Sequence, residues 1–220
     1  MEINMFGNKY DGDKLKDEMI TQLEKKYNKK FYPILLEPRG YQIDYDKLKV
    51  YPEGGDEETD FAHISKFNEG KKTKYIDNYF GIHIRPEYES MIEKEVLKVF
   101  NEVKVFSRFV ADSFSDKLTC ENRLEDAIKL DEFLNVWFDI YINHQDIETT
   151  FENKVKELVT LFEKCNIKGA YSIAFIKKGK FNDINRKNHK NYVKKYTKKF
   201  DDICYKVITG RIPDSSNKTK

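Results

Sequence analysis

Cysteine is scarce in this sequence, and the few cysteines form none of the familiar pairs. Cys120, Cys165 and Cys204 are odd in number and far from the C-x-x-C spacing of a zinc ribbon or a redox motif. This pattern predicts a protein of a reducing compartment. Cys165 falls on the apolar face of a predicted helix, where a cysteine packs as a small hydrophobe, so we expect a buried structural thiol.

Long apolar runs are also missing. Nowhere do about 18 apolar residues follow one another, the length that a membrane-spanning helix needs. Residues 1–10 show no basic region followed by an apolar run, so no signal peptide is predicted. We therefore expect a cytoplasmic protein without a membrane span. A chain from which a signal or lipoprotein anchor had been removed would look the same, and that alternative stays open.

The familiar catalytic motifs are absent too. There is no Walker-type phosphate loop, no G-x-G-x-x-G, no H-E-x-x-H, no G-x-S-x-G and no EF-hand loop. Among only 4 histidines, His63 and His83 fall on neighbouring predicted strands and could supply half of a zinc site, but a third ligand is not evident. Histidines on half-buried strands are more often structural. We predict no catalytic residue, no metal and no cofactor.

What the sequence does have is aromatic side chains. Among 220 residues, 16 are Phe and 14 are Tyr, while 39% are apolar and 35% charged. This composition excludes wholesale disorder and is enough for one large or two small domains with an aromatic core.

The first half of the chain predicts a helix, a β-meander, a second helix and a strand. Leu15, Met19, Leu23 and Tyr27 recur four residues apart and predict a helix over 14–28. Pro86 suits the first turn of the second helix, which carries an apolar stripe to about Asn101. The predicted strands are 31–36, 43–51, 60–67, 74–84 and 103–110.

The second half begins with the clearest strand, 134–142, in which Val136, Phe138 and Ile140 alternate with Trp137, Asp139 and Tyr141. A helix over 147–165 follows after four polar residues. We predict that its apolar stripe covers the face of Phe138, so that Trp137 and Tyr141 point to a second layer or to an exposed binding surface. The other predicted elements are a short helix in 122–130, a strand at 169–176, a helix ending near Lys199 and a disordered tail at 211–220.

These elements predict an α+β fold, an antiparallel or mixed sheet with helices packed on one face. We expect one half over 1–112 and another over 118–210, which could be two similar halves or one continuous domain. The order strand, helix, strand occurs in both halves, but residue identities do not align, so duplication is the less favoured reading.

Two segments concentrate charge of one sign. The loop 52–60 holds five carboxylates beside two glycines and could bind calcium or a basic partner, although such a hairpin loop is usually a solvated turn. The segment 177–199 has ten basic residues and one acidic residue, a local charge of +9 within a chain of net charge +2. An acidic protein or nucleic acid could bind there, although lysine-rich helix faces are commonly only solvated.

Two stretches resemble uncharacterised proteins of low-GC Gram-positive bacteria, namely LKVYPEGGDEETD at 48–60 and DNYFGIHIRPEYE at 77–89. The resemblance extends over roughly 14–110 and includes no recognisable catalytic set. It implies an α+β fold of unknown function. Similar proteins often follow a membrane anchor or lipoprotein signal, which this sequence does not show.

These features favour a non-enzymatic protein-binding module, for which an immunity protein that neutralises a bacterial toxin is a specific hypothesis. The alternatives are a nucleic-acid-binding protein using residues 177–199 and a metal-dependent hydrolase using His63, His83 and nearby carboxylates. The sequence gives no oligomeric state. The predicted partner-binding residues are Trp137, Tyr141, Lys187, Lys190, Lys194, Lys195, Glu53, Asp56 and Glu57.

Overall fold

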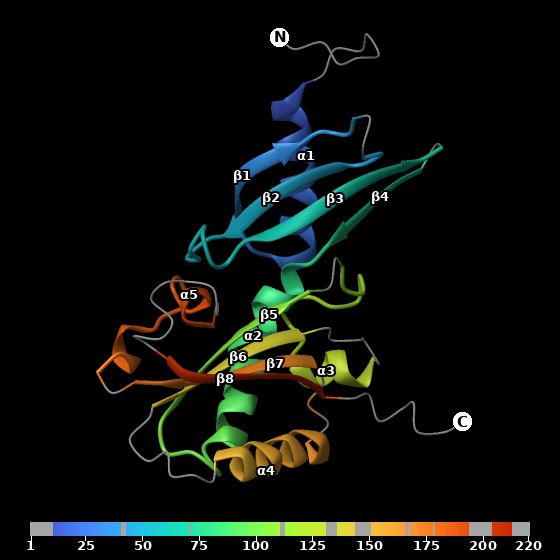
Figure 1. Ribbon diagram of the computed structural model, residues 1–220. Coiled ribbons are helices and arrows are strands. Elements are labelled where there is room, and N and C mark those ends of the chain that lie inside the picture. The colour runs from blue at the N-terminus through green and yellow to red at the C-terminus, as the bar shows by residue number, and fades with distance from the viewer. Residues whose placement is uncertain are drawn as a thin grey trace. The chain divides into compact units, whose positions relative to one another are not determined.

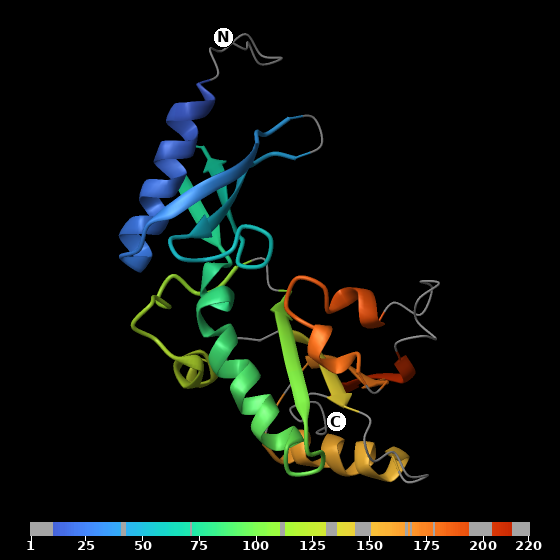
Figure 2. The same ribbon diagram turned by 90° about the vertical axis from the view of Figure 1, so that its left-hand side faces the viewer.

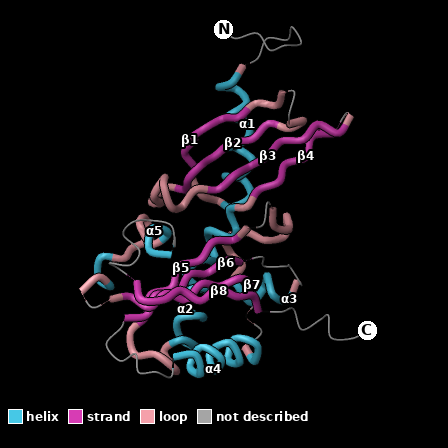
Figure 3. Tube along the Cα trace, in the orientation of Figure 1, coloured by secondary structure: helices cyan, strands magenta, loops and turns pink. Residues whose placement is uncertain are grey.

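The chain folds as an α+β protein with two four-stranded sheets, one antiparallel and one mixed, which confirms the predicted fold class. A computed structural model describes residues 11–40, 43–70, 72–110, 113–130, 136–143, 151–165, 167, 169–177, 179–193 and 204–212. Figure 3 shows the two sheets as separate groups of strands. In the part of the chain described, no helix is long and apolar enough to cross a membrane.

The chain divides into two compact units, and neither is continuous in sequence. The first unit takes residues 1–83 and 111–132, and the second takes 84–110 and 133–220. These borders differ from the halves 1–112 and 118–210, because strand β5 (Val103–Phe109) belongs to the second unit and residues 118–132 belong to the first.

The first unit is a four-stranded antiparallel meander with one long helix on one face (Figures 1 and 2). Its order β1-β2-β3-β4 follows the chain, as the short predicted connections suggested. Helix α1 begins after Asp11, whose carboxylate accepts a hydrogen bond from the Lys14 amide, and ends at Asn28 in the left-handed conformation. The elements are α1 (Gly12–Tyr27), β1 (Phe31–Glu37), β2 (Asp46–Pro52), β3 (Ala62–Glu69) and β4 (Lys72–Asp77).

The core of the first unit lies between α1 and the sheet. Met19 and Leu23 of α1 are almost fully buried, as are Leu48 and Ile64, the paired residues of β2 and β3. This confirms the apolar stripe predicted from the four-residue spacing. Since one side of β2 and β3 is used for this core, alternate residues of these strands point to the opposite side of the sheet.

Helix α2 (Tyr79–Val96) corrects two predictions. Residues 79–84, expected to be a strand, form its first turns, and Pro86 lies inside it instead of at its start. The Asp77 carboxylate accepts hydrogen bonds from the Tyr79 amide, at 3.1 Å, and from the Tyr27 hydroxyl, at 2.7 Å, which fixes the turn from β4 into the helix. The first strand of the predicted strand–helix–strand order is therefore 72–77 and not 79–84, and it belongs to a different sheet from the strand 103–109 that follows the helix.

The second unit has the sheet order β5-β6-β7-β8, in which only β6 and β7 run parallel. A parallel pair needs a crossover connection, and helix α4 lies between these strands in sequence. The elements of this region are β5 (Val103–Phe109), α3 (Leu124–Lys129, in the first unit), β6 (Val136–Asn143), α4 (Phe151–Lys164), β7 (Gly169–Ile176), the 3₁₀-helix η1 (Phe181–Asp183), α5 (Lys190–Val193) and β8 (Cys204–Ile212).

Helices α2 and α4 cover one face of this second sheet. Phe138 is fully buried, and its ring meets that of Phe162 in α4 at 5.6 Å and that of Tyr88 in α2 at 6.3 Å between centroids. Leu158 of α4 is also fully buried. The predicted packing of the 147–165 helix on β6 is confirmed for its described part, while residues 147–150 lie outside the described residues.

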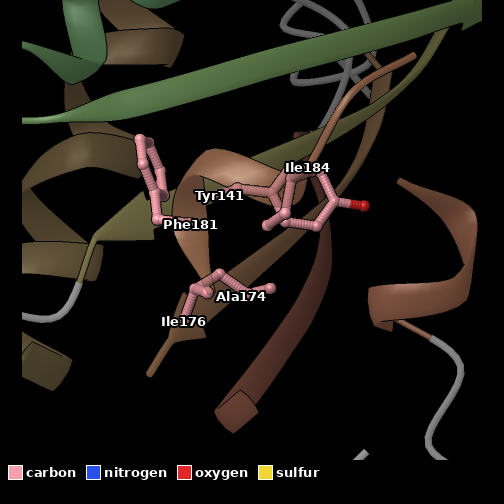
Figure 4. Close-up of a cluster of buried hydrophobic side chains, with 5 residues drawn as sticks. All are labelled: Tyr141, Ala174, Ile176, Phe181 and Ile184. Atoms are coloured by element: carbon pink, nitrogen blue, oxygen red, sulfur yellow. The ribbon is translucent and has the colours of Figure 1, made fainter. Parts of the chain in front are cut away.

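The opposite face of β6 is covered over part of its length. Tyr141 is fully buried in a cluster with Ala174 and Ile176 of β7 and with Phe181 and Ile184 of the segment that follows (Figure 4). This segment, with η1 and α5, lies on the other side of β5 from α2 (Figure 2). Of the two options left open for this face, Tyr141 therefore belongs to a covered second layer.

The end of the chain differs from the prediction. Residues 204–212 form β8, which pairs with β7, so the tail predicted to start at residue 211 cannot include Arg211 and Ile212. Residues 213–220, and 194–203 of the predicted helix, lie outside the described residues. Cys165 was predicted to be a buried thiol on the apolar face of a helix. It is exposed, because α4 ends one residue before it.

Candidate partner-binding site

The face of the first sheet turned away from α1 gathers aromatic and basic side chains. Strand alternation and register place them together, since the opposite side of β2 and β3 is buried. We call this set the outer face. It includes the aromatic and aliphatic residues Tyr32, Leu35, Tyr45, Tyr51, Phe61, Phe67 and Ile76, the lysines Lys47, Lys49, Lys72 and Lys74, the polar residues His63 and Ser65, and the carboxylate of Glu37 opposite Lys47.

Side chains of the outer face rest on one another in pairs across neighbouring strands. The rings of Tyr32 and Tyr51 are 5.4 Å apart between centroids, and those of Tyr45 and Phe67 are 4.7 Å apart. The Lys49 ammonium lies 3.8 Å from the centroid of the Phe61 ring. Cross-strand pairs of this kind limit side-chain motion before any partner arrives. The side chains of the outer face are thus held in place in the free chain, so a ligand placed on them would cost little side-chain conformational entropy.

The acidic loop, residues 53–60, joins β2 to β3 at one end of the outer face. The loop is ordered by its own carboxylates: Asp60 accepts a hydrogen bond from the Asp56 amide, and Asp56 accepts one from the Glu58 amide, both at 2.9 Å. Glu53 and Glu57 are exposed, and Glu53 accepts a hydrogen bond from the Tyr32 hydroxyl at 3.3 Å. In the part of the chain described, no group of acidic, histidine or cysteine side chains could hold a metal ion.

His63 and His83 do not lie on neighbouring strands, contrary to expectation. His63 is on β3, whereas His83 is on helix α2, where its Nε2 lies 3.2 Å from the carbonyl oxygen of Asn122. The reason is the early start of α2. The strand alternation that placed the two rings on one sheet therefore does not apply.

The partly open face of the second sheet contains a buried polar network centred on Asp139. Its carboxylate accepts hydrogen bonds from the Ser172 hydroxyl and from Trp137 Nε1, the latter at 3.0 Å, and it lies 3.4 Å from His189 Nδ1. Burial by itself would raise the pKa of Asp139, but the hydrogen bonds from His189, Ser172 and Trp137 outweigh it and lower that pKa. The network thus holds a carboxylate that stays charged in the interior.

This network does not have the order of a nucleophilic triad. In such a triad the histidine stands between the hydroxyl and the carboxylate and takes the hydroxyl proton. Here Asp139 stands between Ser172 and His189, and Ser172 donates to the carboxylate. The arrangement instead ties the segment 179–193 to the sheet, together with the hydrogen bond from the Tyr141 hydroxyl to the His189 carbonyl at 2.8 Å.

The basic segment is a covering layer and not one long helix. Within its described part only 190–193 form an α-helix, and Phe181, Ile184 and His189 are buried. Arg186 is committed internally, since it forms an ion pair with Glu89 and lies over the ring of Phe106. Lys187 and Lys190 are exposed, while Lys194 and Lys195 lie outside the described residues.

The predicted partner-binding residues are thus spread over both units. Glu53, Asp56 and Glu57 lie in the acidic loop of the first. In the second, Trp137 is half-buried, and Tyr141 is fully buried and has no surface to offer a partner as the chain is folded. The aromatic residues of the outer face were not predicted to be partner-binding residues, although the alternation of Lys47, Lys49 and Tyr51 with buried residues was a signal for them.

A solved structure resembles this chain distantly. No protein-family model matches the chain, and no curated protein matches it in sequence. The chain is similar to the crystal structure of a DUF5037 family protein from Ruminococcus gnavus ATCC 29149, with 12% sequence identity and a TM-score of 0.49. The similarity covers 89% of this chain and 90% of the other.

Proposed function

We propose that this protein is a non-enzymatic protein-binding module whose binding site is the outer face together with the acidic loop. The observation that supports this is the gathering of half-exposed aromatic rings and lysines on a sheet face that no described helix covers, beside exposed carboxylates. Aromatic rings supply contact area at low entropic cost, and charges steer association and fix the register of a partner.

The presence of both charge signs favours a protein partner over a nucleic acid at this site. The Lys47 and Lys49 side chains would attract phosphates, but the exposed carboxylates of Glu53 and Glu57 would repel them. A protein surface can carry acidic groups opposite the lysines and basic groups opposite the loop. We therefore propose a partner with both kinds of charge and an apolar centre.

Within this class we propose an immunity protein that acts in the cytoplasm and neutralises a bacterial toxin. A neutralising protein works by covering its target in one-to-one ratio, so it needs a preformed surface and no catalytic group. The ordered acidic loop and the paired rings of the outer face are features of such a surface.

The test is affinity capture from the source organism, together with co-expression with a neighbouring toxin gene, scored as colony survival. The double variant Lys47→Glu, Tyr51→Ala should lose about thirtyfold or more in affinity, as expected when a hot spot is removed. The matched control is Ile128→Ala, Lys129→Glu, a pair of exposed residues on α3. Absence of a partner and of protection would refute the proposal, as would a partner that both double variants bind equally well.

A further inference from the structure

Four residues form a straight row across the partly open face of the second sheet. Arg108 of β5 is opposite Trp137 of β6, Trp137 is opposite Ala170 of β7, and Ala170 is opposite Arg211 of β8. Both arginines are exposed, and Trp137 and Ala170 are half-buried. The row crosses three strand spacings, so the two arginine Cα atoms are about 14 Å apart. We call these residues the Trp137 row.

Two neighbours hold the indole of Trp137 in place, the Asp139 carboxylate and the Arg108 guanidinium. Its Nε1 donates to the buried Asp139 carboxylate at 3.0 Å, so its hydrogen-bonding group is used inside the protein. The Arg108 guanidinium carbon lies 5.8 Å from the ring centroid. The part of Trp137 left for a ligand is the surface of its ring, which is suited to stacking and lies next to the Arg108 cation.

Charge on this side of the second unit is predominantly positive. In the residues described here, no carboxylate pairs with Arg108 or Arg211. The covering segment on the same side adds three exposed lysines, Lys180, Lys187 and Lys190, and one exposed carboxylate, Asp183. The central carboxylate, Asp139, is buried and engaged by its three partners. This field attracts a polyanion.

We propose that the Trp137 row binds single-stranded nucleic acid, with one base stacked on Trp137 and backbone phosphates on Arg108 and Arg211. Single strands alternate planar bases with phosphates, and sequence-tolerant binding sites for them combine aromatic platforms with basic side chains. An acidic polypeptide would use the two arginines but has no general need of the half-exposed ring of Trp137. This site lies on the second sheet and the outer face lies on the first, so a test of one proposal does not decide the other.

Trp137 itself supplies the measurement, because it is the one tryptophan of the chain. Titration with short oligothymidylate and oligouridylate at low salt should quench its fluorescence as a base stacks on the indole. Trp137→Ala, followed by anisotropy of a labelled oligonucleotide, should weaken binding about tenfold. Circular dichroism will establish that each variant is folded.

The arginines are tested by salt dependence. Arg108→Gln with Arg211→Gln removes two phosphate contacts, so the slope of log K against log salt should become shallower by about 1.4. Lys156→Gln with Lys164→Gln, two exposed residues of α4, makes the same change in net charge and should leave the slope unchanged. Oligonucleotides that are not retained at low salt would overturn the proposal. So would equal slopes for the two double variants, or quenching by polyglutamate at lower concentration than by oligothymidylate, which would assign the row to an acidic polypeptide.

Discussion

Phe138 is the residue on which the packing of the second unit depends. Its ring is fully buried between Tyr88, Phe162 and Tyr171. Phe138→Ala should lower the free energy of unfolding by about 3 to 5 kcal/mol, because a cavity remains where the ring was. Urea unfolding followed by circular dichroism gives the value. Leu35→Ala, at a side chain that is 52% exposed, is the control and should change stability little. Equal effects of the two substitutions would contradict the packing described.

Asp139 makes the stability of the second unit depend on pH. Because its pKa in the folded state lies below the ordinary value, the stabilisation is complete above pH 5 and is lost as pH falls through about 4 toward the folded-state pKa. Asp139→Asn should therefore cost about 3 kcal/mol at pH 7 and progressively less as the solution is acidified. Unfolding followed by Trp137 fluorescence at several pH values measures this.

The control for this experiment is Asp183→Asn, at an exposed carboxylate of the covering segment. Its stability difference from the wild type should be small at every pH. A difference for Asp139→Asn that stays constant between pH 7 and pH 3 would show that the charge of the carboxylate is not what stabilises the network.

Gly169 occupies a position that no other residue fits. Its φ is +136°, and a Cβ added there would lie 2.3 Å from the carbonyl oxygen of Val136 on the neighbouring strand. Gly169→Ala should destabilise the protein by about 2 kcal/mol or more, since both the backbone conformation and the β6–β7 spacing oppose a side chain. Thermal unfolding tests this. Gly40→Ala, whose Cβ would meet nothing within 4 Å, should be nearly neutral.

At the scale of the element, α2 contains a proline that weakens it. Pro86 is the eighth residue of the helix and has no amide hydrogen to donate to the Ile82 carbonyl. Pro86→Ala at this exposed position should raise the free energy of unfolding by about 1 to 2 kcal/mol. The stabilisation of the helix is larger than this, but it is partly offset because the unfolded chain gains conformational entropy when proline is removed. Ser90→Ala, at another exposed position of α2, should gain less than half of that in the same denaturation assay. A smaller gain for Pro86→Ala than for Ser90→Ala would refute this explanation.

The elements that could be predicted from the sequence are those in which one signal dominates. The alternation at 136–142 and the helical spacing of Val155, Leu158 and Phe162 each have a single interpretation, and β6 and α4 follow it. At 79–84 two signals compete. The β-branched and aromatic residues favour a strand, whereas the Asp77 carboxylate accepts a hydrogen bond from the Tyr79 amide and so favours the start of a helix. The Tyr27 hydroxyl donates to the same carboxylate and holds it in that position, a tertiary contact that adds to the preference for the helix.

The outer face could be predicted only in part. The alternation of β2 shows which of its own residues point away from the core, but the face also needs β1 and β3 in the correct register. A bulge between Pro33 and Leu35 shifts the register of β1, and no local pattern in the sequence marks it. The Trp137 row depends in the same way on pairing between four strands that span 108–211.

At the scale of the whole molecule, the two units interrupt each other in sequence, and this makes a cut between halves costly. A fragment 1–112 would lose the second segment of the first unit, in which Phe114 and Leu118 are buried. A fragment 118–220 would lose β5 and Tyr88 from the second. We expect neither to unfold cooperatively, as measured by thermal melts and amide dispersion in NMR spectra, whereas the intact chain should. A dispersed spectrum from either fragment would show that a half is sufficient.

The sheet order β5-β6-β7-β8 also bears on how the protein emerges from the ribosome. The β1–β4 meander joins successive strands and can form as soon as residue 77 is free. The second sheet cannot be completed until residue 212 has been synthesised, because β8 closes the edge of β7. Until then β7, six of whose eight residues are buried in the finished protein, has an open edge. An open edge of this kind is the surface on which unfinished chains associate wrongly, so the interval between the synthesis of β7 and that of β8 is the stage at which this protein is most exposed to misassembly.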